Sequence, residues 1–244
     1  HYFEPFIGSA AVFFHLQPRL ATLSDRNQKL IEVYEAIQQD VSDVIAALRP
    51  HQNESEYYYR IRAQDLAQLT AVQRAARLIY LNKTCYNGLY RENRKGQFNV
   101  PFGRYHNPTI CDEERLLAAS DALQGVTLKT ADFVEAVSTA EPGDFVYFDP
   151  PYVPLNQTSN FTDYSKYGFG EADQRRLADT ICDLTRRGVR VMLSNSSAPL
   201  VYELYENGRY HLHEITARRN INSKASRRGP VKEMLILNYS MTNS

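Results

Sequence analysis

The sequence predicts an α/β fold in which a helical and hairpin insertion interrupts a sheet domain. Strand-like and amphipathic helical segments alternate at both ends of the chain, as expected for a sheet covered by helices. Three strand-like segments end in an acid followed by a loop, at Asp25, Asp132 and Asp149. Ligands of open α/β sheets bind beyond such strand ends. Residues from about 50 to 120 lack the alternation and therefore form the insertion.

The expected strands are short apolar runs bounded by turn residues. They are residues 2–6, 21–25, 126–133, 145–148 and 189–195, followed by a closing antiparallel pair at 211–216 and 232–239. The first strand leads into the small-residue turn "IGSAA". Such a turn allows a cofactor to approach the backbone closely. It lacks the full G-x-G-x-x-G spacing, so tight packing of strand on helix is an alternative explanation.

The expected helices follow from apolar residues at helical spacing. A short helix covers residues 12–16, and a long one covers 27–48, where apolar positions keep a helical period until Pro50. A third helix begins after Thr70, a good N-cap residue, and runs to about Leu81. A fourth covers residues 171–187 and ends at Gly188. Helices alternating with strands complete the α/β pattern.

Composition excludes several classes of protein. Among 244 residues, 43% are hydrophobic, and no run of about 18 apolar residues or basic-then-apolar leader occurs. The three cysteines do not form an even framework, which favours a reducing compartment, and we expect a cytoplasmic protein. The net charge is zero, but residues 82–106 contain five basic side chains against one acid, and residues 217–232 contain six against none. Local basic segments suit an anionic partner, although solvated loop charge is an equally simple explanation.

The stretch "DFVYFDPPYVP" combines groups that suit chemistry on a nucleobase. The exocyclic amine of a base is a poor nucleophile until its N–H groups donate to acceptors. Asp149 supplies an ionised acceptor, and the Pro150 carbonyl supplies a second, held rigid because Pro151 follows. Tyr152 offers a ring on which an extruded base can stack. The alternative is a stiff turn with Tyr152 in the core.

Several blocks of the chain resemble the Dam-type adenine-N6 DNA methyltransferases, which use S-adenosylmethionine. The matching blocks, in the order of the family, are "FEPFIGSAAVFF", "SDRN", "LNKTCYNGLYRENRKGQFNVPFGRY", "DFVYFDPPY", "SNFTDYSKYGFG" and "VMLSNS". The resemblance implies a Rossmann-like S-adenosylmethionine-dependent methyltransferase sheet at residues 1–49 and 121–244. It also implies a DNA target-recognition insertion at residues 50–120. The implied activity is methylation of a flipped-out adenine in duplex DNA, with GATC as target.

The resemblance assigns a role to each matching residue. It implies cofactor binding by Phe6, Gly8, Ser9, Asp25, Asp132, Phe133 and Asp149. It implies catalysis by Asp149, Pro150 and Tyr152, and closure over the target base by a loop with Phe161, Tyr164 and Phe169. In the hairpin, Arg91 matches the guanine-reading arginine, Leu89 and Pro101 match contacts to thymine methyls, and Tyr86 and Asn87 match residues that brace the opened duplex. Arginine is the best bidentate partner for guanine, and a two-stranded ribbon fits the major groove.

The chain also departs from the pattern of the family. No Trp-x-Gly-Gly-Lys-like segment precedes His1. We expect residues upstream of His1, and the alternative is a protein that binds the cofactor poorly. Ala131 stands where glycine is usual. We expect double-stranded DNA as partner, no membrane, no metal and a monomer, and leave open whether a cognate restriction endonuclease accompanies the protein. An RNA or protein-amide methyltransferase of the same fold, or a DNA-binding protein without turnover, remain alternative functions.

Overall fold

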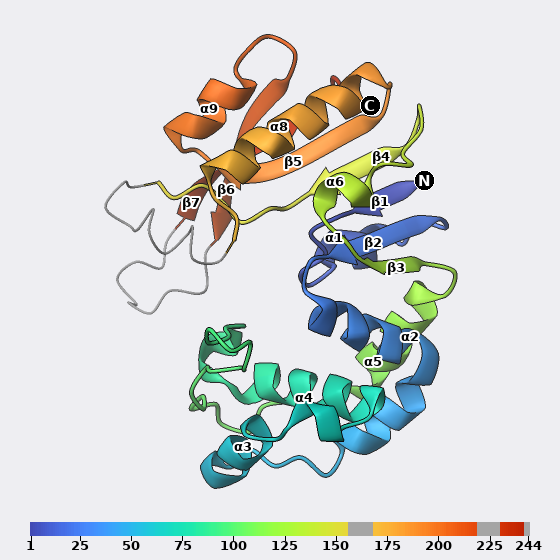
Figure 1. The fold of residues 1–244 in the computed structure, drawn as a ribbon, viewed down its shortest axis with the longest axis vertical. Helices are drawn as coiled ribbons and strands as arrows, with labels where there is room; N and C mark the ends of the chain where they lie inside the picture. The colour runs from blue at the N-terminus through green and yellow to red at the C-terminus, as the bar shows by residue number, and fades with distance from the viewer. Residues whose placement is uncertain (156–167, 219–229, 242–244) are drawn as a thin grey trace. The chain divides into compact units, whose positions relative to one another are not determined.

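The computed structural model describes residues 1–155, 168–218 and 230–241 (Figure 1). These residues divide into two compact units, one formed by residues 1–26 and 125–244 and the other by residues 27–124. We call them the sheet unit and the insertion unit. The predicted catalytic and target-recognition domains differ from these units mainly in that residues 27–49 are placed with the sheet. These two domains stay a prediction.

The sheet unit contains a seven-stranded sheet in its described part, in the order β3-β2-β1-β4-β5-β7-β6. The strands are β1 (Tyr2–Glu4), β2 (Ala21–Asp25), β3 (Thr127–Thr130), β4 (Phe145–Phe148), β5 (Arg190–Ser196), β6 (His211–Arg218) and β7 (Pro230–Leu237). The first five run parallel, whereas β7 is antiparallel to both β5 and β6. The α/β prediction and its closing antiparallel pair are therefore confirmed.

Two strands end earlier than the sequence predicts, for identifiable reasons. The strand β1 stops at Glu4 because Pro5 has no N–H to donate to a neighbouring strand. The strand β3 stops at Thr130 because Asp132 caps the helix α6 (Phe133–Ala136), its side chain accepting from the Val134 N–H at 3.1 Å. As a result, the predicted site residues Phe6 and Asp132 lie in loops just beyond the ends of β1 and β3.

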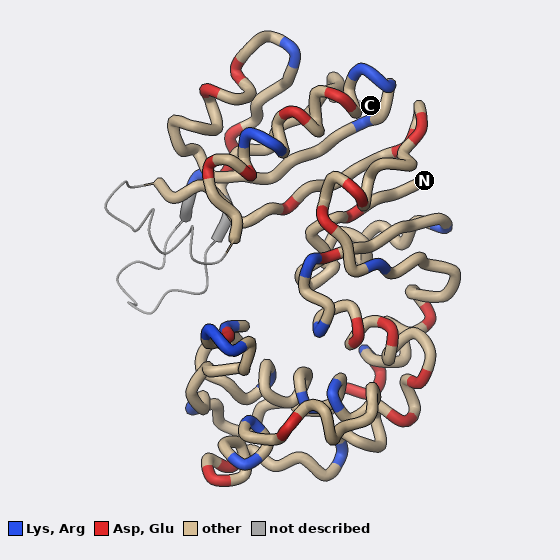
Figure 2. The backbone as a smooth tube through the Cα atoms, viewed as in Figure 1, with Lys and Arg blue, Asp and Glu red and all other residues tan. Residues whose placement is uncertain are grey.

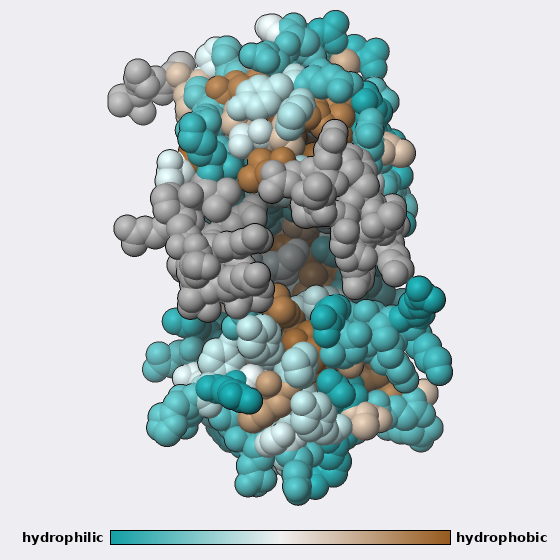
Figure 3. All heavy atoms as spheres, turned by 90° about the vertical axis from the view of Figure 1, so that its left-hand side faces the viewer, coloured by the Kyte–Doolittle hydropathy of each residue, from teal (hydrophilic) through white to brown (hydrophobic). Residues whose placement is uncertain are grey.

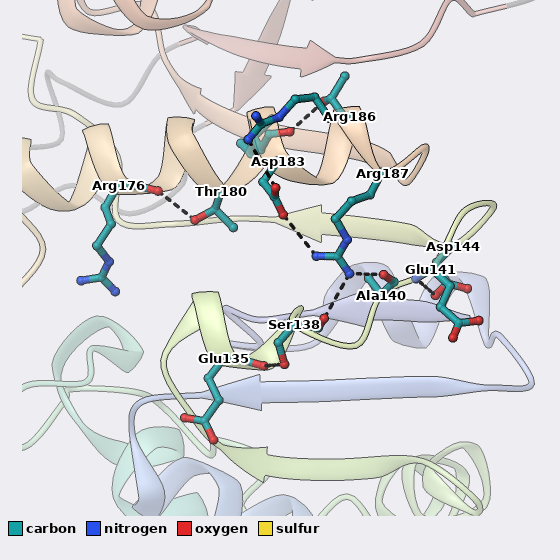
Figure 4. A network of polar contacts seen from close by, with 12 residues as sticks. Glu135, Ser138, Ala140, Glu141, Asp144, Arg176, Thr180, Asp183, Arg186 and Arg187 are labelled. Atoms are coloured by element: carbon teal, nitrogen blue, oxygen red, sulfur yellow. Dashed lines mark hydrogen bonds and ion pairs between the residues drawn. The ribbon is translucent and has the colours of Figure 1, made fainter.

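The other helices of the sheet unit are α1 (Ala11–Leu16), α8 (Glu171–Arg186) and α9 (Pro199–Tyr205). The helix α8 packs on β5 and against α6 and α9. Its last turn is tied to the loop before β4 by Arg187, which donates to the carbonyls of Ser138 and Ala140 and pairs with Asp183 (Figure 4). Side chains such as Phe148, Leu177, Leu193 and Ile236 form the buried core. These contacts hold the loop before β4 and bury Phe148 at the end of the strand.

The insertion unit consists of helices and a hairpin. The helices are α2 (Gln28–Leu48), α3 (Ser55–Arg62), α4 (Ala71–Thr84) and α5 (Glu113–Leu123), with short 3-10 turns η1 (Leu66–Gln68) and η2 (Tyr86–Gly88). Both α4 and α5 pack on α2. The predicted long helix is interrupted at Asp40, whose backbone is not helical. Thr70 caps α4 as predicted, through a capping box with Gln73.

The hairpin, residues 85–103, is less regular than a β-ribbon. Its two isolated bridges join Cys85 to Phe102 and Glu92 to Phe98. The chain reverses at Lys95-Gly96, where the Gly96 N–H donates to the Asn93 carbonyl at 2.9 Å. The Asn87-Gly88 dipeptide lies in η2, away from this reversal, and both residues have positive φ. Lys and Arg are prominent along this segment (Figure 2).

The surface of the described residues is mostly hydrophilic on the face drawn in Figure 3, with apolar colour in small areas. No helix among the described residues is long and apolar enough to cross a membrane.

Candidate active site and nucleic-acid interface

The parallel strands bring four predicted site segments to one edge of the sheet. The carboxyl ends of β3, β2, β1 and β4 share an edge because these strands are parallel neighbours. Asp25 ends β2, Asp149 follows β4, and Phe6 and Asp132 lie two residues beyond β1 and β3. The strand order changes direction between β1 and β4, which is the position where open α/β sheets bind ligands.

The turn after β1 exposes its backbone at this edge. Gly8 and Ser9 are exposed, and the φ of Gly8 is 44°. A Cβ on Gly8 would meet nothing closer than the Phe6 carbonyl oxygen at 4.0 Å, so the backbone conformation rather than space favours glycine. The Ile7 N–H donates to the Ser24 carbonyl at 3.0 Å, which ties the turn to β2. The turn therefore presents accessible backbone next to Asp25.

Three phenylalanines form an aromatic group beside the turn. The ring of Phe6 stacks on Phe133 with centroids 5.4 Å apart and meets the edge of Phe169 at 5.5 Å. Phe169 is buried in the core with Phe133. Its predicted role in closing over a target base stays a prediction, and Phe161 and Tyr164 lie outside the described residues.

Asp132 is held by Arg176, a residue that the sequence did not single out. Arg176 Nη2 lies 2.5 Å from both carboxylate oxygens of Asp132, and its guanidinium covers the Phe133 ring at 4.5 Å. Burial alone raises the pKa of Asp132, but the hydrogen bonds from Arg176 and from the Val134 N–H outweigh it and lower the pKa. Asp132 is therefore an ionised acceptor at the strand edge.

Asp149 remains accessible to solvent, but crowded surroundings change its acidity. Desolvation raises the pKa of the carboxyl, the negative charge of Glu233 raises it further, and a hydrogen bond from Tyr152 opposes both. The net result is a pKa above the ordinary value. The Tyr152 hydroxyl also lies 3.5 Å from Glu233 Oε2, so its single proton can serve either carboxylate, and its ring is half-buried. Asp149 and Tyr152 thus lie within hydrogen-bonding reach of each other, and their catalytic roles stay a prediction.

Glu4 is a second carboxyl near Asp149 that sequence reasoning missed. It is 2% exposed, and its Oε2 accepts from the Tyr2 hydroxyl at 2.7 Å and from the Phe13 N–H at 3.2 Å. Burial raises the pKa of Glu4 to about 7, against these two hydrogen bonds. The available signal was an acid inside the strand-like "YFEPF", where a charge is not expected.

The hairpin carries all five predicted DNA-binding residues. Exposed side chains are Tyr86, Leu89, Arg91 and Pro101, whereas Asn87 is half-buried. The Tyr86 N–H donates to the Pro101 carbonyl at 2.9 Å, which brings the two arms together. The arms are tied to the end of α4 by Gly103, whose N–H donates to the Thr84 carbonyl at 2.8 Å. The structure therefore presents this set on one small element.

Arg91 has a defined partner, Asn99, on the opposite arm. Its Nε donates to Asn99 Oδ1 at 2.7 Å and its Nη2 to the Asn99 carbonyl at 3.2 Å. The Asn99 N–H in turn donates to the Arg91 carbonyl at 2.9 Å. This fork restricts a long side chain that otherwise has many rotamers.

Comparisons with known proteins cover the part of the chain that carries these residues. The family model described as D12 class N6 adenine-specific DNA methyltransferase matches residues 1–221. A type II methyltransferase, M1.LlaDCHI from Lactococcus lactis subsp. cremoris, is 45% identical over 98% of this chain and 86% of that protein. The type II methyltransferase M.MjaIII from Methanocaldococcus jannaschii is 41% identical over 98% and 88%. The DNA adenine methylase of Escherichia coli (strain K12) is 34% identical over 96% and 84%.

A solved structure titled delta-N METTL16 MTase domain superposes with a TM-score of 0.31 at 13% identity, over 54% of this chain and 60% of that chain, a likeness too low to support a conclusion. The family match and the relatives are decisive, because they extend over almost the whole chain and include both the strand-edge site and the hairpin. The chain therefore belongs to the D12 class N6 adenine-specific DNA methyltransferases, a family of enzymes.

Proposed function

We propose that this protein transfers a methyl group from S-adenosylmethionine to the exocyclic amine of an extruded adenine in duplex DNA, at GATC. The observation that carries the proposal is the position of Asp149 and Tyr152. They follow β4 directly beside the end of β1, at the change in strand order, and the pKa of Asp149 is raised. An accessible carboxyl with a raised pKa at a ligand-binding edge supports a role in proton acceptance.

Asp149 accounts for activation of the amine. Its carboxylate accepts an N–H of the target, which returns electron density to the nitrogen, and the Pro150 carbonyl accepts the other. With S-adenosylmethionine bound, the nitrogen would take the methyl group as the sulfur–methyl bond breaks and the sulfur keeps the electron pair, and the surplus proton would leave the nitrogen for an acceptor. Because burial and Glu233 raise the pKa of Asp149, this carboxylate is a better base than an ordinary aspartate.

Tyr152 accounts for holding the base outside the helix. An amine that is paired in a duplex cannot reach a carboxylate at a sheet edge, so the nucleotide must leave the stack. Stacking on an aromatic side chain contributes about 1–3 kcal/mol per base, which offsets part of the lost base stacking. The half-buried ring of Tyr152, four positions from Phe148 of β4, is available for this contact.

The donor set at the strand edge fits S-adenosylmethionine. Asp25 provides a carboxylate for ribose hydroxyls, and Asp132 with Phe133 provides an acceptor and a ring for the adenine. Phe6, Gly8 and Ser9 line the turn beside them, and the exposed backbone of Gly8 allows close approach. The cofactor, when bound, supplies a methyl group that is already activated as a sulfonium. The protein then contributes chiefly alignment and proton acceptance.

The hairpin accounts for the choice of sequence. Arg91 is exposed and prepositioned by Asn99, as suits bidentate reading of guanine in the major groove. Leu89 and Pro101 are exposed on opposite arms and suit contacts with thymine methyl groups, and Tyr86 and Asn87 brace the opened duplex. The choice of GATC rests on the match of this hairpin block to the Dam-type pattern.

The wider setting follows from the same proposal. Residues 1–49 and 121–244 act as the cofactor-binding and catalytic domain, and residues 50–120 as the target-recognition domain. The protein acts as a monomer in the cytoplasm, where DNA is accessible and its three free cysteines stay reduced. Similarity to type II methyltransferases favours a cognate restriction endonuclease as companion.

Labelled S-adenosylmethionine with matched duplexes tests the proposal. A duplex with GATC should be methylated on adenine, whereas a duplex with these four bases permuted and an RNA of the same sequence should not. Asp149→Ala, assayed at a saturating concentration of cofactor, should lower the rate by on the order of 10²–10⁴. Methylation of RNA, or equal labelling of both duplexes, would refute the substrate. Duplex binding without methylation would identify a binding protein that lacks turnover.

A further inference from the structure

The segment that carries Tyr152 has little backbone support of its own. Residues 149–154 follow β4 without helix or strand, and Pro150 and Pro151 have no N–H to donate. A catalytic segment must be held to within about half an ångström to work well. The support therefore has to come from side chains elsewhere in the fold.

Two buried side-chain amides link the backbone on either side of Tyr152 through hydrogen bonds. Gln174 Nε2 donates to the Pro151 carbonyl at 2.9 Å, and Asn195 Nδ2 donates to Gln174 Oε1 at 3.1 Å. The Val153 N–H donates to Asn195 Oδ1 at 3.1 Å. The chain of hydrogen bonds thus leaves the backbone just before Tyr152 and returns to it just after.

The orientation of both amides is fixed by the two backbone groups at the ends of this chain of hydrogen bonds. A backbone carbonyl can only accept and a backbone N–H can only donate, so each amide has one orientation that satisfies both neighbours. Reversing either amide would place donor against donor or acceptor against acceptor. The Ser196 N–H reinforces the orientation of Asn195 by donating to the same Oδ1 at 2.8 Å. Gln174 and Asn195 therefore form a clamp on residues 151–153 in which each hydrogen bond has a fixed donor and a fixed acceptor.

Both amides occupy positions where an apolar side chain would be expected. Gln174 is 1% exposed on α8 and Asn195 is 0% exposed on β5, and the core residues Leu177 and Leu193 lie on the same two elements. Replacing two mutually bonded buried polar groups by apolar ones of similar shape can be nearly neutral for stability. Stability alone gives little reason for these residues, whereas a requirement to hold residues 151–153 explains both.

The Ser196 hydroxyl completes the hold on the segment by donating to the Val153 carbonyl at 2.5 Å. Val153 is thus fixed through both its N–H and its carbonyl, from two consecutive residues at the end of β5. Because β4 and β5 are adjacent parallel strands, the end of β5 lies where it can reach this segment.

We propose that Gln174 and Asn195 are positioning residues that set the orientation of Tyr152, and of the Pro150 carbonyl, relative to Asp149. The inference rests on the proposed function and adds to it two residues that act through the backbone of the catalytic segment. They affect extrusion of the base and the methyl-transfer step. They affect neither cofactor affinity nor the choice of GATC, because the contacts described here join them to residues 151–153 rather than to the cofactor edge or the hairpin.

The test compares Gln174→Met, which removes the donor to Pro151 at nearly constant size, with wild type under single-turnover conditions. Misplacement by about 1 Å can lower a rate on the order of a hundredfold, so we expect a loss between about tenfold and a hundredfold. A 2-aminopurine at the target position should show reduced extrusion. Affinity for S-adenosylhomocysteine, measured by calorimetry, should be unchanged, as should the ratio of affinities for GATC and permuted duplexes.

Two further variants separate positioning from folding. Gln174→Glu, in its protonated form, can donate to Pro151 and accept from Asn195, so its activity should recover as pH falls, relative to wild type at each pH. Asn238→Ala is the matched control, since the Asn238 amide also bridges backbone around β5, through Val191 N–H at 2.7 Å and the Val189 carbonyl at 2.8 Å, but away from residues 151–153. It should lower thermal stability with little change in the single-turnover rate.

The results separate this inference from the proposed function. An active wild type with an unchanged Gln174→Met rate overturns the clamp and leaves the function standing. A Gln174→Met loss that is matched by Asn238→Ala, or that appears in cofactor affinity, also overturns it. Absence of adenine methylation by wild type itself would instead refute the proposed function.

Discussion

The buried carboxyl of Glu4 leads to a quantitative prediction about pH and stability. Burial raises its pKa from an ordinary 4.5 to about 7 in the folded protein. The protonated form is therefore favoured by folding. Its contribution to stability is complete below about pH 4.5 and is lost as pH rises through about 7. The difference between the two pKa values, at about 1.4 kcal/mol per pH unit, corresponds to a loss of about 3 kcal/mol.

Glu4→Gln removes this titration while keeping an oxygen that accepts from the Tyr2 hydroxyl and the Phe13 N–H. Wild type and variant should have similar melting temperatures at pH 5. At pH 8.5 the variant should be more stable, and at about 2–4 °C per kcal/mol the advantage reaches roughly 6–12 °C. Melting followed by far-UV circular dichroism at the two pH values measures the change.

The exposed Glu206 supplies the control, since Glu206→Gln alters charge without altering a buried group. Its difference from wild type should be the same at both pH values. The reasoning is refuted if the Glu4→Gln difference does not grow with pH, or if it changes in favour of wild type.

Three further changes test the site and the hairpin. Gly103→Ala places a Cβ 2.7 Å from the Cys85 carbonyl oxygen, just after α4. This clash should lower the free energy of unfolding by about 1–3 kcal/mol and weaken binding of a GATC duplex, measured by fluorescence anisotropy. Asn99→Ala frees Arg91 and should reduce discrimination against duplexes that lack the guanine by up to about tenfold, measured by competition binding. Glu233→Gln removes a charge that raises the pKa of Asp149, so the acidic limb of the kcat/KM profile should move to lower pH.

Each of these changes has its own control or contradicting result. Gly170→Ala, where a Cβ meets nothing within 4 Å, should leave duplex binding intact. Asn93→Ala loses a contact with Gln97 across the same hairpin, at 2.9 Å, and should leave discrimination at the guanine unchanged. An acidic limb that stays in place in Glu233→Gln would show that this glutamate does not act on Asp149.

Much of the sheet and of the candidate site could be predicted from local pattern. The apolar runs before Asp25 and Asp149 could be assigned as strands, because their periodicity and turn residues are local properties. The reversal at Lys95-Gly96 is likewise a local property, because glycine supplies the positive φ that a tight turn requires. The short helices α3, α5 and α9 were not predicted, since their apolar spacing is weak and packing on neighbours stabilises them.

The sequence by itself determined the alternation of strands and helices, the acids at the strand ends and the hairpin block, and these residues already indicated an adenine methyltransferase. Only the tertiary structure decided how acidic Glu4 and Asp149 are, and which residues hold the catalytic segment. Gln174 and Asn195 lie 23 and 42 positions along the chain from the backbone groups that they bind. The physical reason is that burial and hydrogen-bond partnership depend on which strands become neighbours. No local periodicity encodes that information.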